Sequence, residues 1–242
     1  MGTIVVIDVY AEAGRPGVHG ALASANAVLH RADRVFSTWR PDSAISRLRR
    51  GEITAGQIPP EVTEVLRLCA VARDLSDGWF DPWAMPGGVD PTGYVKGWAA
   101  QQALAELQAT GVSGAIVNAA GDVASSGTMG AGVPFRIGIA DPFAPRQLAA
   151  IVDLTGAVAT SGSYERGQHL VDPFSGRPAA RAASASVTGP DLGLADAVAT
   201  ALAVAGDSGL AWIEPIDGYE ALVIGRDGAR KCTHGFPLAP AA

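Results

Sequence analysis

The segment from residue 157 to 206 contains three short motifs. They read Ala159-Thr160-Ser161-Gly162, then His169-Leu170-Val171-Asp172-Pro173, and finally Ala195-Asp196-Ala197-Val198-Ala199-Thr200. The run from 193 to 205 is rich in Ala, Leu and Val and is followed by Gly206, which predicts a helix that ends at this glycine. On such a helix Asp196 and Thr200 place a carboxylate and a hydroxyl on one face. Two hard oxygens suit Mg²⁺, and an ordinary polar helix face is the alternative that the spacing leaves open.

The composition indicates a globular protein. The chain has 242 residues, of which 48% are hydrophobic and 17% charged, enough for one large domain or two small ones. A net charge of -6 argues against general nucleic-acid binding, which needs a basic face. Two cysteines, Cys69 and Cys232, do not make a disulfide framework, so we expect a reducing compartment, and the apolar helical run around Cys69 predicts a small buried side chain there. The first residues lack a basic region and a long apolar segment, so we expect neither export nor membrane insertion.

Hydrophobic periodicity predicts helices and strands in irregular order. Helices are expected over residues 18–35, 60–76 and 193–205, with another that begins after Asp90 and reaches to about Ala109, and short ones after Ser43 and near Leu210. Strands are expected over residues 3–10, 115–118, 135–139, 148–154, 157–161, 169–171, 184–187 and 220–224. Because strands outnumber the helices and alternate with them irregularly, the pattern favours an α+β fold over a doubly wound sheet.

Candidate binding residues lie in two loops and in the first turns of one helix. Trp39 beside Arg40 offers a flat apolar surface next to a cation, and a surface turn with a buried Trp is the alternative. Residues 79–88 are too rich in Pro, Gly and aromatics for regular structure and predict a shaped, functional loop. Lys96 lies in the first or second turn of a helix, where the dipole disfavours it. A nearby anion would explain it, and an exposed surface lysine is the alternative.

Several blocks, taken in chain order, resemble the FAD:protein FMN transferase family, also called ApbE. The blocks are Met1-Gly2-Thr3, Phe36-Ser37-Thr38-Trp39-Arg40-Pro41-Asp42-Ser43, Phe80-Asp81-Pro82, Asp90-Pro91-Thr92-Gly93-Tyr94-Val95-Lys96-Gly97, Asn118-Ala119-Ala120-Gly121-Asp122, Ala159-Thr160-Ser161-Gly162, His169-x-x-Asp172-Pro173-x-x-Gly176 and Ala195-Asp196-x-x-x-Thr200. The resemblance implies one ApbE-like, T-fold-related domain over residues 1–242. Its fold would be α+β, with mixed, largely antiparallel sheets flanked by helices and an active-site cleft between its sub-parts.

The resemblance also implies a reaction and its residues. FMN would pass from FAD to a Thr or Ser hydroxyl of an acceptor flavoprotein, with Mg²⁺ bound and AMP released. The Mg²⁺ ligands would be Asp196, Thr200 and the backbone carbonyl of Gly93. The residues lining the FAD cleft would be Met1, Trp39, Met85, Asp90, Lys96, His169 and Val171. His169, with Asp172 close in sequence, is the candidate base, and a buried structural histidine is the alternative.

The chain departs from the family pattern in ways that keep other functions open. Family members are usually longer and often carry an export or lipoprotein segment, so the expected location is the cytoplasm, with a cytoplasmic acceptor. Ala120 replaces a usual Gly, Pro91-Thr92 replaces Leu-Gly, and Ala199 stands where some members have an acidic residue. The alternatives are Mg²⁺-dependent hydrolysis of FAD to FMN and AMP, and a flavin-binding protein without catalysis. The sequence leaves the acceptor and the oligomeric state open.

Overall fold

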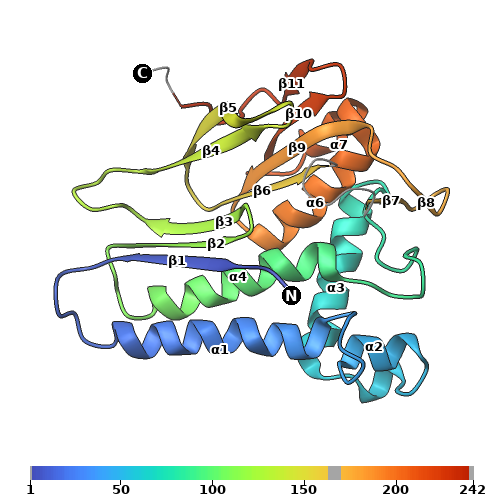
Figure 1. Ribbon diagram of the computed structural model, residues 1–242, viewed down its shortest axis with the longest axis horizontal. Helices are drawn as coiled ribbons and strands as arrows, with labels where there is room; N and C mark the ends of the chain where they lie inside the picture. The colour runs from blue at the N-terminus through green and yellow to red at the C-terminus, as the bar shows by residue number, and fades with distance from the viewer. Residues whose placement is uncertain (1, 163–169, 240–242) are drawn as a thin grey trace.

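The main sheet has seven antiparallel strands in the order β1-β2-β3-β6-β9-β10-β11 (Figure 1). The computed structural model describes residues 2–162 and 170–239. The strands of this sheet are β1 (Val5–Tyr10), β2 (Gly114–Ala119), β3 (Asp122–Gly127), β6 (Ala157–Gly162), β9 (Ala182–Gly189), β10 (Glu220–Gly225) and β11 (Arg230–Cys232). β9 pairs with β6 and β10, packs against α6 and is buried along its whole length.

Two smaller ladders flank this sheet. β4 (Phe135–Asp141) pairs with β5 (Ala144–Leu154), and β7 (Val171–Asp172) pairs with β8 (Arg177–Pro178). The β4–β5 hairpin covers one face of the main sheet, where Phe135 and Leu154 pack against residues of β2, β3 and β6. The opposite face is therefore the one that receives the helices.

Helices cover that second face in two layers (Figure 1). The helices are α1 (Val18–Phe36), α2 (Ala44–Arg49), α3 (Pro60–Leu75), α4 (Thr92–Gln108), α6 (Leu192–Ala205) and α7 (Leu210–Ile213), with short 3₁₀ turns η1 (Ala55–Gln57) and η2 (Gly206–Gly209). α4 packs on β2 and β3, α6 packs on β6 and β9, and α1 lies outside α4. A Cβ atom on Gly97 would collide with the carbonyl of Leu192, so this glycine permits the close approach of α4 to α6.

Helix α6 is almost entirely enclosed. The stretch Leu192–Ile213 is long and apolar enough to cross a membrane. Of its most apolar 18 residues, however, 67% are buried inside the fold. Core helices of soluble proteins pass the same test of length and composition, so we interpret α6 as the central core helix.

The α+β prediction is confirmed, and the strands differ from the predicted ones at several places. The short strands β8 and β11 were not predicted. β3 was not predicted as a strand, because Asp122–Gly127 consists mostly of small and polar residues. Of the strand predicted over residues 169–171, residue 169 lies outside the described residues, and Val171 pairs with Pro178 in the separate β7–β8 ladder rather than with a strand of the main sheet. The two-residue turn between β2 and β3 holds Ala120 at φ 52° and Gly121 at φ 94°, a geometry that suits glycine at both positions.

Candidate active site

A cavity of about 430 Å³ lies between the first turn of α4, the middle of α6 and the loops that follow α1 and α3. Most of the predicted site residues line it: Trp39, Met85, Asp90, Gly93, Lys96, Val171, Asp196 and Thr200. These residues are far apart in sequence, and the packing of α4 against α6 brings the two central groups of them together.

The floor of the cavity contains the three predicted metal ligands. Asp196 is 2% exposed, and its Oδ2 accepts a hydrogen bond from the Gly97 N–H at 3.1 Å. In a regular helix this same N–H faces the carbonyl of Gly93, so the carboxylate lies beside that carbonyl. A Cβ on Gly93 would lie 3.6 Å from Thr200 Oγ1. These contacts place Asp196, Thr200 and Gly93 at the interface of α4 and α6, and all three residues line the cavity.

Lys96 links two buried carboxylates. Its Nζ lies 2.5 Å from Asp122 Oδ2 and 4.0 Å from Asp196 Oδ1. Asp122 is fully buried, and its Oδ1 accepts from the Thr160 N–H at 3.1 Å. Of the two alternatives for Lys96, the structure supports the nearby anion, and the anion comes from the protein itself.

This cluster has more negative than positive charge. Burial raises the pKa of Asp196 well above its usual value, and the neighbouring Asp122 carboxylate raises it further, while Lys96 and the Gly97 N–H oppose the rise. Two carboxylates and one ammonium leave one uncompensated negative charge when all three are ionised. A bound cation would neutralise it.

The residues present fit Mg²⁺. Carboxylate, hydroxyl and carbonyl oxygens are the hard ligands that this ion prefers, and Mg²⁺ commonly keeps several positions for water and phosphate oxygens. Among residues 2–162 and 170–239, no three His, Cys, Asp or Glu side chains are grouped so that they alone would hold a metal ion. The set found here, with a single carboxylate ligand, would leave positions on the ion for a ligand phosphate.

Aromatic and acidic residues form the cavity wall. Trp39 is 94% exposed at the cavity edge, so the alternative of a buried Trp is wrong. Asp90 is held within the protein: its Oδ1 accepts from the N–H and the hydroxyl of Thr92, at 3.0 and 2.6 Å, and its Oδ2 pairs with Arg49 Nη1 at 3.3 Å. Met85 and Val171 complete the apolar part of the wall.

The comparison with protein families decides the relationship. The ApbE family model matches residues 1–87 and 86–223. The chain belongs to the ApbE family. Curated relatives named "FAD:protein FMN transferase" include a Rhodobacter capsulatus protein, 39% identical over 128 residues, or 49% of this chain and 24% of the relative. The Escherichia coli K12 protein of that name is 30% identical over 151 residues, 58% and 43% of the two chains. The aligned part is thus less than half of each relative.

Solved ApbE structures share the fold over almost the whole chain. The Vibrio cholerae flavin transferase ApbE superposes with a TM-score of 0.83 at 23% identity, covering 96% of this chain and 94% of that one. The Thermotoga maritima ApbE protein gives 0.84 at 22% identity and covers 97% and 94%. The Pseudomonas stutzeri flavinyl transferase ApbE, in its apo form, gives 0.82 at 25% identity and covers 97% and 92%.

One predicted residue of this ApbE-family chain, Asp172, is not among the residues that line the cavity. Asp172 caps the β7–β8 turn, where its Oδ1 accepts from the N–H groups of Phe174 and Ser175. Met1 and His169 lie outside the described residues, so the catalytic role of His169 with Asp172 stays a prediction. Sequence reasoning left out Asp122 and Arg49 as site residues. The Asn118–Asp122 block was the available signal for Asp122, whereas a single arginine on a short helix gave none for Arg49.

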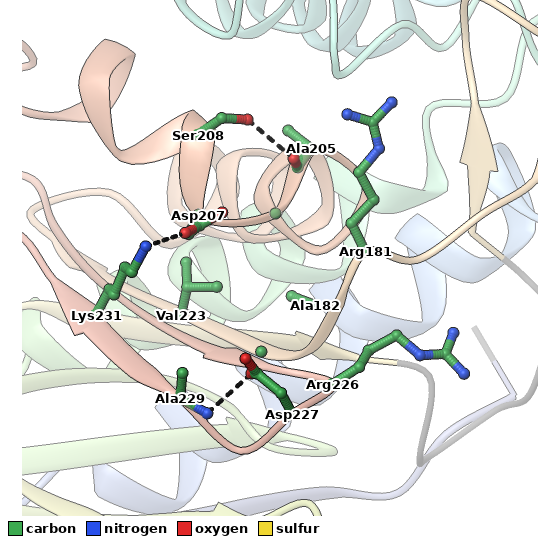
Figure 2. Close-up of a pocket in the computed structure, with 12 residues that line it drawn as sticks. Arg181, Ala182, Ala205, Asp207, Ser208, Val223, Arg226, Asp227, Ala229 and Lys231 are labelled. Carbon is green, nitrogen blue, oxygen red and sulfur yellow. Dashed lines mark hydrogen bonds and ion pairs between the residues drawn. The ribbon is translucent and has the colours of Figure 1, made fainter.

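Figure 2 shows a second cavity, of about 460 Å³, beyond the C-terminal end of α6 in this ApbE fold. Its charged side chains have partners within the protein. The pairs are Lys231 with Asp207, Asp227 with the N–H of Ala229, Arg226 with the carbonyl of Ala180, and Arg181 with the ring of Trp79. Among the described residues that line it, none is a predicted site residue. We assign no ligand to this cavity.

Proposed function

We propose that this chain catalyses the Mg²⁺-dependent transfer of FMN from FAD to a Thr or Ser hydroxyl of an acceptor flavoprotein, with release of AMP. The observation that carries the proposal is that Asp196, Thr200 and Gly93 lie together on the floor of a cavity with aromatic and apolar walls. The names of the curated relatives support the same reaction.

The proposed reaction exchanges one phosphate bond for another. The acceptor hydroxyl oxygen attacks the phosphorus on the FMN side of the FAD pyrophosphate. The bond from this phosphorus to the bridging oxygen breaks, and AMP leaves with that oxygen. The hydroxyl proton passes to a base, for which His169 with Asp172 remains the candidate.

The residues of the floor have separate tasks in this proposal. Asp196, Thr200 and the Gly93 carbonyl would hold Mg²⁺, which supplies Lewis-acid neutralisation of phosphate charge. The Gly97 N–H fixes the orientation of the Asp196 carboxylate. Lys96 limits the repulsion between Asp122 and Asp196, and its side chain is 20% exposed at the cavity, within reach of a phosphate.

The cavity wall would bind the two ends of FAD. Trp39 offers a large exposed ring for stacking on the isoalloxazine or the adenine. Met85 and Val171 supply apolar contact on the same cavity. Their positions on loops around a rigid helical floor are typical of ligand sites, in which a few polar groups orient a mainly apolar contact.

The test is an assay of FAD with Mg²⁺, with and without a flavoprotein acceptor domain, followed by mass analysis of the acceptor. An acceptor heavier by one FMN, together with one AMP released per transfer, supports the proposal. Free FMN released equally in both reactions would instead establish a hydrolase. FAD binding without AMP release across a panel of acceptors would establish a non-catalytic flavin-binding protein.

A further inference from the structure

We propose that Arg49 is a positioning residue, which fixes the wall of the FAD cavity and the first turn of α4 through Asp90. This inference rests on the proposed function, because it concerns the affinity of the same cavity for FAD. It also gives Asp90 a different main task from flavin contact: Asp90 connects Arg49 to the start of α4.

Three groups of the 86–90 loop bind one guanidinium. Arg49 is the last residue of α2, and its Nε donates to the Gly87 carbonyl at 3.0 Å. Its Nη2 donates to the Pro86 carbonyl at 2.8 Å, and its Nη1 pairs with Asp90 Oδ2 at 3.3 Å. The Arg49 and Asp90 side chains are only 19% and 24% exposed. A planar guanidinium suits such a multidentate contact, which a lysine could not reproduce.

The loop is shaped to receive this side chain. Gly87 and Gly88 have φ angles of 80° and 103°, which favour glycine. A Cβ on Gly87 would lie 2.6 Å from Arg49 Nη2, so a larger residue would displace the guanidinium from the carbonyls. The Asp90 N–H also donates to the Pro82 carbonyl at 2.9 Å, which closes the loop at its base.

Asp90 transmits this contact to α4. Its Oδ1 accepts from the N–H and the hydroxyl of Thr92, the first residue of the helix, while its Oδ2 binds Arg49. Gly93, which supplies the proposed carbonyl ligand of Mg²⁺, comes next in the chain. Both oxygens of Asp90 are therefore engaged between α2 and the first turn of α4.

A fixed wall favours binding, because a loop that is already ordered loses less conformational entropy when a ligand arrives. Met85 and Pro82, on the same loop, line the cavity. Arg73 gives a second contact at the other end of this loop, with Nε 3.1 Å from Asp81 Oδ2, but the Arg73 side chain is 50% exposed. Surface ion pairs contribute little, so we assign the main effect to Arg49.

The test compares Arg49→Ala with Arg47→Ala, a control on the same helix whose side chain is 48% exposed and 3.7 Å from Glu52. We expect Arg49→Ala to raise both the Kd for FAD, measured by flavin fluorescence titration with Mg²⁺, and the KM for FAD about tenfold, as for a lost charge-assisted contact. Its kcat should stay within about threefold, since the floor residues remain. The Kd and KM of Arg47→Ala for FAD should stay within about twofold of the wild-type values. Those of Arg49→Lys should fall between the values of the wild type and of Arg49→Ala.

Two results would overturn the inference. One is an unchanged Kd and KM for FAD in Arg49→Ala. The other is a fall in kcat that follows the folded fraction, measured by circular dichroism, with KM unchanged, because that is the signature of a merely structural residue. The Kd titration needs no turnover, so a wild type that binds FAD but transfers no FMN would refute the proposed function and leave this test intact.

Asp90→Asn tests the link to Asp90. Asparagine keeps an oxygen for Thr92 but removes the charge that pairs with Arg49. We expect this change to raise the Kd for FAD in the wild-type background and to alter it less than about twofold in the Arg49→Ala background. An equal loss in both backgrounds would mean that Asp90 acts on FAD independently of Arg49, and the link would be wrong.

Discussion

Replacing Asp196 by asparagine tests the proposed metal site while it retains the fold. The carboxylate is 2% exposed, and its Oδ2 accepts from the Gly97 N–H. An asparagine oxygen can accept the same hydrogen bond, so the contact between α4 and α6 is retained. The negative charge, which is the principal attraction for Mg²⁺ in the proposed ligand set, is lost.

The size of the effect follows from ligand linkage. A ligand at about a hundred times its Kd stabilises the folded state by about 2.7 kcal/mol. In a domain of about 150 to 250 residues, about 1 kcal/mol shifts the Tm by about 2 to 4 °C. Saturating Mg²⁺ should thus raise the Tm of the wild type by about 5 to 11 °C. The Asp196→Asn variant should show almost none of this rise.

Without Mg²⁺, the stabilities of the wild type and the Asp196→Asn variant should differ in the opposite direction. Burial and the Asp122 carboxylate raise the pKa of Asp196 in the folded state above its ordinary 3.8. The folded state therefore binds the proton more tightly than the unfolded state, and its stability falls as the pH rises above about 4 towards the folded-state pKa. Asparagine removes this loss. Without Mg²⁺ at neutral pH, the variant should be at least as stable as the wild type.

Scanning calorimetry with and without Mg²⁺, at pH 5 and pH 7.5, measures both effects. Asp207→Asn is the matched control, because its side chain is 52% exposed and pairs with Lys231 away from the cavity. This control should keep the full Mg²⁺-dependent shift. An equal shift in Asp196→Asn and the wild type would refute the metal assignment, and a metal-free variant that is markedly less stable than the wild type would refute the charge argument.

Three further changes test other parts of the structure. Lys96→Met should destabilise the metal-free protein by about 3 to 5 kcal/mol in urea unfolding at pH 7, because two buried carboxylates lose their ammonium; the deficit should shrink at lower pH. Ala120→Gly should raise the unfolding free energy by about 1 kcal/mol, because alanine at φ 52° is strained. Burial, assisted by a nearby acidic charge, raises the pKa of the Cys69 thiol to about 12. A thiol reagent at pH 8 should therefore modify exposed Cys232 alone until the protein is unfolded.

Local patterns predicted the helices better than the strands. Apolar spacing indicated α1 and α3 closely, and the short helix α2 begins directly after Ser43, which caps it by accepting from the Ser46 N–H. β3 escaped prediction because its small polar residues have little strand propensity. Its conformation comes from pairing with β2 and β6, which are neighbours in space that a local window does not contain.

The site residues also divide into those that a local pattern predicts and those that depend on the packing of distant elements. The pair Asp196 and Thr200 was visible as a four-residue spacing on one helix. Asp122 completes the charge cluster from β3, across the interface with α4, and no local pattern gives that distance. Arg49 reaches the 86–90 loop about forty residues away in the chain, so its contacts depend on how α2 packs.

The first turns of α4 join the two proposed functions of the cavity, FAD binding and Mg²⁺ binding. Lys96 and Gly97 lie three and four residues after Gly93, which places both on the same side of the helix as Gly93, and this side meets Asp196 and Thr200 of α6. Asp90 and Arg49 hold the start of the same helix. Displacing this start should weaken FAD and Mg²⁺ binding together, whereas Asp196→Asn acts on α6 and should weaken Mg²⁺ binding far more than metal-free FAD binding. Comparing both affinities in the Arg49→Ala and Asp196→Asn variants therefore distinguishes a site ordered through α4 from two independent sites.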